Sequence, residues 1–165
     1  MSGTLMEIRE LLERFRRGAE LAAVVLTGVH PDEVDFVPAP GKWSIRQIIA
    51  HLADSEIVGA YRFRSVIAEN NPTLQSYDQN AWSANLDYTR RKPSQSLETF
   101  RRVRGENYEL LAGLPEAAFE RTGNHTERGP LTLGQLLKTY AEHAENHARQ
   151  MQAVRDEYGK FKGKK

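Results

Sequence analysis

The hydrophobic residues of this chain recur every three or four positions in four long segments. The first segment spans residues 4–26, and its apolar positions are Leu5, Ile8, Leu11, Leu12, Phe15, Ala19, Ala22 and Val25. This spacing places the apolar side chains on one face of an α-helix and leaves the charged side chains on the other. We therefore predict an amphipathic helix that ends before His30-Pro31, because proline disfavours helical geometry in the residue before it.

The second and fourth helical segments begin with the same N-terminal signal. Ser44 is followed three residues later by Gln47, and Thr132 is followed in the same way by Gln135. In such a capping box, the Ser or Thr side chain accepts a hydrogen bond from the backbone N–H three residues on, and the Gln side chain bonds back. The second helix is predicted to run for about seven turns, and the fourth carries its apolar stripe as far as Tyr158.

The third helix is predicted between Pro93 and Gly113, and long connections precede and follow it at 71–93 and 115–131. No stretch shows the alternation typical of a β-strand, so the predicted fold class is all-α: a four-helix bundle in one domain, residues 1–165. The connection at 71–93 is long enough to cross from one end of the bundle to the other.

Composition excludes several classes of function. The 165 residues are 39% hydrophobic and 27% charged, as in an ordinary globular protein. Basic and acidic residues number 23 and 22, so no charge excess favours nucleic acid or an anionic membrane. Cysteine is absent, which excludes thiolate ligands and nucleophiles from the chain. Residues 1–15 do not resemble a signal peptide and no segment is apolar enough to span a membrane, so a cytoplasmic protein is expected. Lys160 to Lys165 is expected to be a frayed, solvated end.

Two histidines, His143 and His147, lie four residues apart in the last predicted helix. This spacing stacks both rings on one face of a helix, about one turn apart. A divalent metal would be held tightly only with a third ligand, because open sites usually have three protein ligands and a water. His51, beside the apolar stripe of the second helix, is the candidate for that ligand. The simpler alternative is that these histidines are hydrogen-bonded core residues.

The residues around the histidines limit the mechanism. In the HExxH motif of zincins the glutamate directly follows the first histidine, whereas Glu145 lies two residues from each histidine, roughly 200° around the helix. Glu145 should therefore point away from a metal. Asp54, three residues after His51, either orients that ring or is a solvated helix residue. His30 and His125 lie in loops and are not assigned to the site.

The weaker candidates for substrate contact are Asp54, Asp78, Arg104 and Asn107. Arg104 and Asn107 fall between apolar positions of the third helix, where polar side chains need partners or line a wet interior pocket. Tyr77 and Trp82 lie beside Asp78 in the long connection. They either line the mouth of the site or anchor the connection to the bundle.

Three motifs in this order resemble the DinB-like superfamily, and most closely its YfiT branch of metal-dependent hydrolases. They are Trp43-Ser44-Ile45-Arg46-Gln47-Ile48-Ile49-Ala50-His51-Leu52, Tyr77-Asp78-Gln79-Asn80-Ala81-Trp82 and His143-Ala144-Glu145-Asn146-His147. The resemblance covers nearly the whole chain. It implies an up-down-down-up bundle with a long crossover between the second and third helices. It also implies a divalent metal, nickel or zinc, held by His51, His143 and His147, and a homodimer.

Activities within the superfamily differ, since bacillithiol S-transferases and mycothiol-dependent isomerases share this fold and site. The sequence therefore supports a metal-dependent hydrolase or a low-molecular-weight thiol S-transferase that acts on a small molecule, with the metal activating a water or a substrate thiol. The alternative is a non-catalytic, stress-associated or ligand-binding bundle with a structural metal or none. Three imidazoles suit zinc, nickel, iron and manganese alike, so the ligands do not select the metal.

Overall fold

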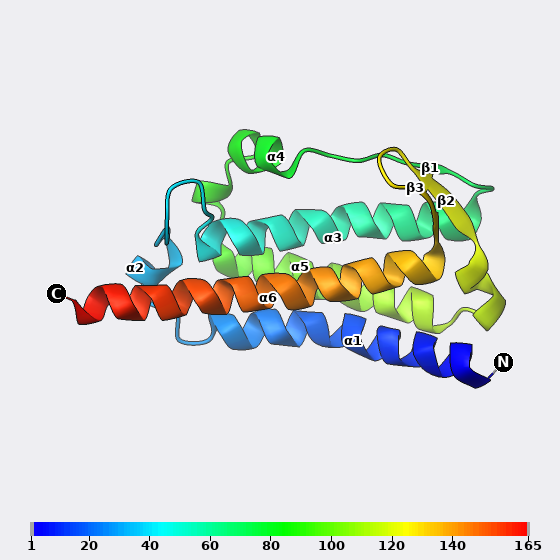
Figure 1. The fold of residues 1–165 in the computed structure, drawn as a ribbon, viewed down its shortest axis with the longest axis horizontal. Helices are drawn as coiled ribbons and strands as arrows, with labels where there is room; N and C mark the ends of the chain where they lie inside the picture. The colour runs from blue at the N-terminus through cyan, green and yellow to red at the C-terminus, as the bar shows by residue number, and fades with distance from the viewer. Residues whose placement is uncertain (1, 165) are drawn as a thin grey trace.

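The computed structural model describes residues 2–164 and confirms the four-helix bundle (Figure 1). Its long helices are α1 (Ser2–Leu26), α3 (Ile45–Ala68), α5 (Pro93–Ala112) and α6 (Leu133–Gly163). In Figure 1, α1 and α6 run in one direction, and α3 and α5 run in the opposite direction. The topology is therefore up-down-down-up, with the crossover between α3 and α5 returning along the outside of α3.

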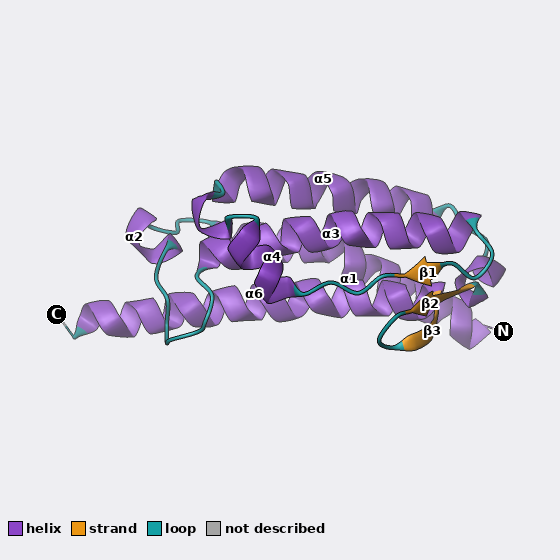
Figure 2. Ribbon diagram, turned by 90° about the horizontal axis from the view of Figure 1, so that it is seen from above, coloured by secondary structure: helices purple, strands orange, loops and turns teal. Residues whose placement is uncertain are grey.

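Short elements occupy the connections. They are α2 (Pro31–Val34), α4 (Gln79–Asn85), 3₁₀ turns at Tyr88–Arg90 and Glu116–Glu120, β1 (Thr73–Leu74), β2 (Thr122–His125) and β3 (Gly129–Thr132). The prediction that the chain has no strands is therefore wrong. Figure 2 shows the three strands packed together at one end of the bundle.

The small sheet joins the two long connections. Its strand order is β1-β2-β3, with β1 parallel to β2 and β2 antiparallel to β3. Leu74 is paired with His125, and the backbone N–H of Thr126 donates to the Leu74 carbonyl at 3.1 Å. Strands of two to four residues are too short to show alternation in the sequence, and their pairing depends on contacts between distant segments. The sheet places the β2–β3 turn beside the crossover.

Both predicted capping boxes are present. The Gln47 backbone N–H donates to Ser44 Oγ at 3.3 Å, and Gln47 Oε1 accepts from the Ser44 N–H at 2.9 Å. Thr132 and Gln135 make the equivalent bonds at 3.0 and 2.9 Å. The last helix continues to Gly163, so most of the basic tail is helical rather than frayed, while Lys165 lies outside the described residues.

The core contains two apolar clusters with polar groups between them. One cluster includes Phe15 and Phe63, and the other includes Leu52 and Phe100. The Arg104 guanidinium lies between the clusters, 4.2 Å from the ring centroid of Phe15 and 4.8 Å from that of Phe100. The histidines of α3 and α6 lie in the same polar layer as Arg104. His51, for example, directly precedes Leu52 of the second cluster. None of the described helices is long and apolar enough to cross a lipid bilayer.

The close approach of α1 to α6 depends on Gly18. A Cβ atom at this position would lie 2.7 Å from the Cβ of Ala144 and would also overlap the guanidinium of Arg104. Neither neighbour can move freely, because Ala144 has no rotatable side chain and Arg104 is buried. Glycine at position 18 therefore sets the distance between α1 and the helix that carries His143 and His147.

We expect Gly18→Ala to lower the free energy of unfolding by about 1–3 kcal/mol through overpacking. Gly105→Ala is the matched control, because a Cβ there meets nothing within 4 Å and lies on the exposed face of α5. Alanine is the better helix former, so the control should be neutral or stabilising by up to about 1 kcal/mol. Urea denaturation measures both, and equal effects at the two positions would contradict the close approach.

Candidate metal centre

His51 lies two turns inside α3 and is only 1% exposed. Trp43, just before the capping residue of this helix, packs its indole 5.1 Å from the His51 ring, measured between centroids. The capping box fixes where α3 begins, and the indole then covers one side of the imidazole. The ring of His51 is thereby directed toward α6.

His143 and His147 extend from α6 to meet it. The Nε2 atoms of His51 and His143 are 3.0 Å apart, and those of His143 and His147 are 3.1 Å apart. The three ligand nitrogens all lie within 4.8 Å of one another. Ligands around a tetrahedral ion with metal–nitrogen bonds of about 2.0–2.1 Å are separated by about 3.3 Å. The structure thus brings the three predicted histidines together at a spacing that suits one metal ion.

Burial keeps these imidazoles uncharged. Desolvation, with a smaller effect of the neighbouring His147, lowers the pKa of His51 to about 3 and that of His143 to about 2. Burial also lowers the pKa of His147, against a smaller opposing effect of its hydrogen bond to Gln150. The neutral imidazole is the form that offers a nitrogen lone pair to a metal. The donor set therefore fits a divalent cation near neutral pH.

Gln150 fixes the orientation of His147. Its Oε1 lies 2.7 Å from His147 Nδ1, so that Nδ1 carries the proton and Nε2 is left as an acceptor. His51 has no such partner, because its Nδ1 is buried without a hydrogen bond. With Nδ1 unable to find an acceptor, the ring is held by packing against Trp43. Gln150 was not identified from the sequence, although its position one turn after His147 would have been a signal.

Glu145 points away from the histidines, as predicted from its angular position. It forms a bidentate ion pair with Arg14 of α1, at 2.9 and 2.8 Å. This pair lowers the pKa of the Glu145 carboxyl. The carboxylate is therefore committed to the α1–α6 contact.

Asp54 does not orient His51. Its Oδ2 accepts from the Tyr88 hydroxyl at 2.9 Å, and its Oδ1 pairs with the Arg91 guanidinium at 2.7 Å. Both partners belong to the end of the crossover, whereas His51 Nδ1 has no partner. The solvated alternative is also wrong, since Asp54 is buried. Asp54 instead fastens the crossover to α3.

The other three candidates have structural partners. Asp78 caps α4 by accepting from the backbone N–H groups of Asn80 and Ala81 at 2.9 and 3.0 Å. Arg104 and Asn107 are buried and donate to the two oxygens of Glu56, at 2.7 and 3.1 Å. None of these contacts involves the histidines.

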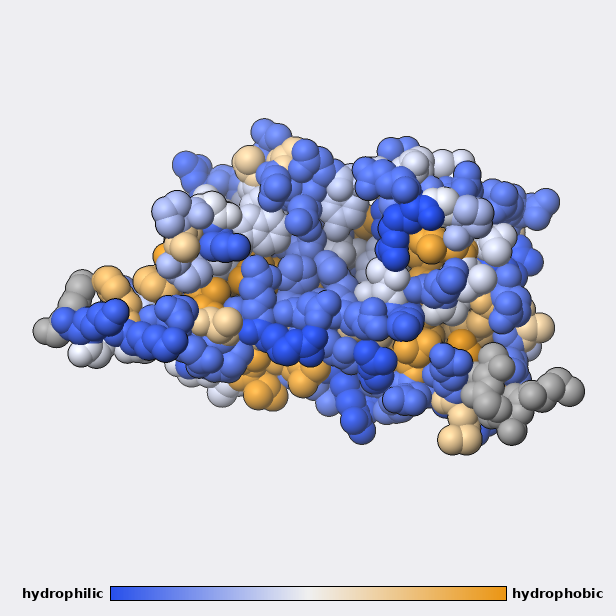
Figure 3. Space-filling model, viewed as in Figure 1, coloured by the Kyte–Doolittle hydropathy of each residue, from blue (hydrophilic) through white to orange (hydrophobic). Residues whose placement is uncertain are grey.

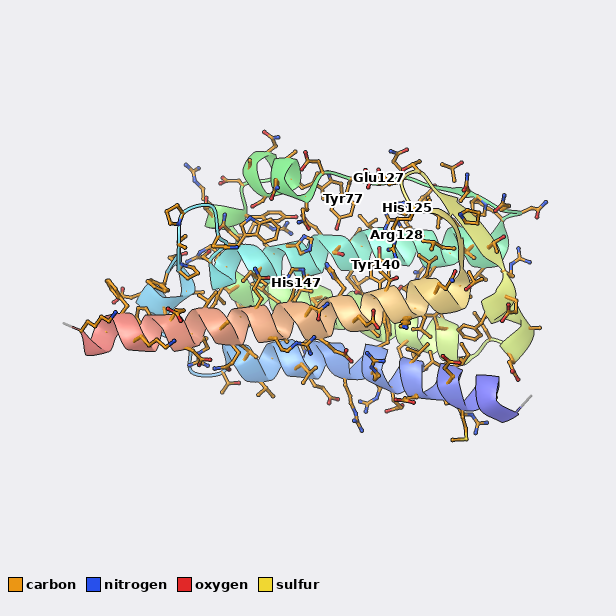
Figure 4. The ribbon with its side chains drawn as sticks, viewed as in Figure 1. Tyr77, His125, Glu127, Arg128, Tyr140 and His147 are labelled. Carbon is orange, nitrogen blue, oxygen red and sulfur yellow. The ribbon has the colours of Figure 1, made fainter. Side chains whose placement is uncertain are left out.

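The two aromatic residues of the crossover pack against each other. The ring centroids of Tyr77 and Trp82 are 4.4 Å apart. Burial raises the pKa of Tyr77, whose hydroxyl lies beside Ser55 on α3. In Figure 4, Tyr77 lies between the crossover and α3. The pair therefore anchors the crossover over α3.

The two histidines set aside on sequence have different environments. His30 is largely exposed and caps α2, with its Nδ1 accepting from the Asp32 N–H at 3.2 Å. His125 is buried at the end of β2, on the face that also carries Tyr140 and His147 (Figure 4). Its position became evident only from the unpredicted sheet.

A bundle of this topology with three converging histidines on α3 and α6 defines a class of helical protein with a candidate metal centre. The chain belongs to the DinB superfamily, whose model matches residues 12–151. This confirms the resemblance found in the three sequence motifs.

Relatives within the superfamily share a common description. A "Putative metal-dependent hydrolase" of Oceanobacillus iheyensis is 32% identical over 117 residues, covering 70% of this chain and 67% of that protein. "Putative metal-dependent hydrolase YfiT" of Bacillus subtilis is 30% identical over 139 residues, covering 84% of this chain and 76% of YfiT. The solved structure of YfiT, described as a probable metal-dependent hydrolase with an unusual four-helix bundle topology, matches with a TM-score of 0.86 at 25% identity. That match covers 92% of this chain and 87% of the YfiT chain.

The role of Asp54 as an anchor of the crossover is testable. Asp54→Asn removes the charge that pairs with Arg91, and we expect it to lower the free energy of unfolding by about 1–2 kcal/mol. Asp35→Asn is the control, since Asp35 also pairs with an arginine, Arg46, but is mostly exposed, and exposed pairs contribute less than about 1 kcal/mol. Both are measured by urea denaturation, and a smaller loss for Asp54→Asn than for Asp35→Asn would contradict this role.

Proposed function

We propose that this protein is a metal-dependent enzyme in which His51, His143 and His147 hold one divalent cation, nickel or zinc. The observation that carries the proposal is the convergence of three uncharged imidazole nitrogens, with Nε2 separations of 3.0 and 3.1 Å. Its support from the comparisons is that the relatives are named as metal-dependent hydrolases.

A divalent cation at this position would supply a Lewis acid that activates a water molecule or a thiol near neutral pH. The protein's own residues prepare the position for it. Packing against Trp43 holds the His51 ring, and the hydrogen bond to Gln150 sets the tautomer of His147. Burial keeps the three rings neutral, so that the ligands need not lose protons on binding.

Three carboxylates on the helices that carry the histidines are paired with arginines. Glu145 pairs with Arg14, Asp54 with Arg91, and Glu56 with Arg104. A zincin-like carboxylate base is therefore missing from the described contacts of the site. This favours a nucleophile that loses its proton easily, and a thiol with a pKa of about 8.5 meets that condition better than water.

The reaction proposed is thus transfer of a low-molecular-weight thiol to an electrophilic small molecule, or hydrolysis of such a molecule with water as the nucleophile. The chain has no cysteine, so the thiol must come from a substrate. A cytoplasmic location and a homodimer, expected from the sequence and the resemblance, form part of the same proposal.

The ligand assignment predicts the loss of bound metal from a double variant, His51→Ala with His143→Ala. Removing two of three ligands leaves one imidazole, which cannot hold a divalent ion against dialysis. His30→Ala is the control, because His30 is exposed and caps only α2. Elemental analysis after dialysis should find about one metal per chain in the control and in the unaltered protein. Full occupancy in the double variant would refute the assignment.

A catalytic metal on a preformed bundle predicts that the metal-free protein remains folded. Two apolar clusters and the buried polar contacts of Arg104 hold the helices independently of the histidines. After chelation we expect a helical circular dichroism spectrum and one cooperative thermal transition, at a lower temperature by the linkage of metal binding to folding. A non-cooperative or unfolded metal-free protein would indicate a structural metal. Screening the metal-loaded protein for thiol adducts and hydrolysis then tests the activity, and turnover should vanish in the double variant.

A further inference from the structure

Arg62 is a buried cation without an anionic partner. It is only 9% exposed, and its guanidinium makes no ion pair within the described residues. Nη1 donates to the Tyr140 hydroxyl at 3.2 Å, and Nη2 donates to the Gln75 carbonyl. Nε is buried and has no hydrogen-bond partner. Among the described residues, the partners of this full positive charge are therefore two neutral oxygens and the Tyr77 ring, whose centroid is 6.0 Å from the guanidinium carbon, and the Nε–H is unused.

The carboxylates that could neutralise Arg62 are paired with other arginines. Glu56 lies one and a half turns before it on α3 but accepts from Arg104 at 2.7 Å. Asp54 is paired with Arg91 at 2.7 Å. An uncompensated buried charge is costly, and a bound anion would relieve that cost.

Other hydrogen-bond donors surround the guanidinium. Burial raises the pKa of Tyr140 to about 12, so its hydroxyl accepts from Arg62 and still keeps a proton to donate. His125 Nδ1 accepts from the backbone N–H groups of Glu127 and Arg128 at 3.2 and 3.3 Å. Its proton is therefore on Nε2, which is a further donor.

The charge on this face is positive. His125 pairs with Leu74 in the sheet, and the carbonyl of the next residue, Gln75, accepts from Arg62. Burial lowers the pKa of His125, and the charges of Arg62 and then Arg128 act in the same direction. Glu127 is the acidic side chain close to His125 and has the opposite, smaller effect. It is exposed on the β2–β3 turn and makes no ion pair with Arg62 in the described structure.

The donors other than Arg62 can be followed in Figure 4. His125 and Arg128 lie at the β2–β3 turn, Tyr140 lies below them, and His147 lies further along α6. In Figure 3 this face is hollowed between the part formed by α4 and the part formed by the β2–β3 turn. Tyr140 precedes His143 by three residues on α6, and the ring centroids of these two residues are 6.4 Å apart. The hydroxyl that accepts from Arg62 therefore belongs to a ring that adjoins the histidines.

An apolar cavity adjoins Arg62. It has a volume of about 460 Å³, and its lining residues include Ile57, Tyr61, Arg62, Tyr77 and Trp82. The aromatic walls suit the carbon skeleton of a ligand, and Arg62 supplies the charge at its edge.

We propose that Arg62, with Tyr140 and His125, forms a subsite for an oxyanion, either a carboxylate or a phosphate. Where the proposed function holds, this oxyanion belongs to the substrate that reacts at the histidines, since the Tyr140 ring lies 6.4 Å from the His143 ring, measured between centroids. The guanidinium binds two oxygens through its donors, the Tyr140 hydroxyl and His125 Nε2 complete the set, and the adjoining cavity takes an apolar portion of the same molecule.

The test is calorimetric titration of the full chain with benzoate and with phenyl phosphate, each with and without chelator. We expect saturable binding of at least one probe in both conditions, and the better probe identifies the oxyanion. Arg62→Met should weaken binding about tenfold or more, because charge-assisted hydrogen bonds to the anion are lost. Arg62→Lys should weaken it less, since the charge remains. Tyr140→Phe should weaken it by about three- to tenfold.

Arg64→Met is the matched control. Arg64 is on the same helix and, like Arg62, donates to a backbone carbonyl. It is exposed, however, and its side-chain partner is Asn107 instead of Tyr140. Should Arg62→Met fail to fold, the Arg62→Lys and Tyr140→Phe variants still decide the matter. The proposal is overturned by the absence of binding, by equal binding in the Arg62 and Arg64 variants, or by binding that disappears with chelator. Loss of metal binding alone would refute the proposed function and leave this result unchanged.

Discussion

The buried ion pair between Arg104 and Glu56 holds the four long helices of this bundle in one arrangement. Arg104 extends from α5 and donates to Glu56 on α3 at 2.7 Å, and the same guanidinium donates to the backbone carbonyls of Tyr140 on α6 and Phe15 on α1. One side chain thus bonds the other three helices. A buried pair of this kind adds little net stability over apolar packing, but each helix must present its oxygen at the correct height to avoid an unpaired charge.

That requirement fixes the level at which the histidines meet. Tyr140, whose carbonyl Arg104 binds, is one turn before His143, and Glu56 is just over one turn after His51. A shift of α3 along its axis would therefore disrupt the ion pair with Glu56, and a shift of α6 would disrupt the hydrogen bond to the Tyr140 carbonyl. The Arg104 guanidinium also occupies the space that a side chain at position 18 would need. Because this residue is glycine, α1 can lie close to α6. Rigid support of this kind is what a metal site needs, because its ligands must be held within a fraction of an ångström.

Sequence reasoning succeeded where the signal was local and failed where it depended on distant contacts. The capping boxes at Ser44 and Thr132 and the apolar stripes follow from the order of neighbouring residues, and they placed the histidines on facing helices. The partner of Asp54 could not be read in this way, because Arg91 approaches only after the crossover has folded back. The sheet was missed for the same reason, since β1 and β2 pair across the two long connections. Consequently, the position of His125 was also missed.

The buried polar groups of this bundle are stabilised in three different ways, and these differences indicate the role of each group. The charge of Arg104 is neutralised within the fold by Glu56, and the guanidinium also donates to two carbonyls, although its Nε, like that of Arg62, is buried without a hydrogen-bond partner among the described residues. The three histidines avoid charge altogether, because desolvation lowers their pKa values and leaves lone pairs that converge on one point. Arg62 is neither paired with a carboxylate nor able to become neutral, since a guanidinium keeps its proton in proteins. A group whose charge the fold neither pairs nor removes needs a partner from outside the chain, and its place beside the histidines makes an anionic ligand the simplest such partner.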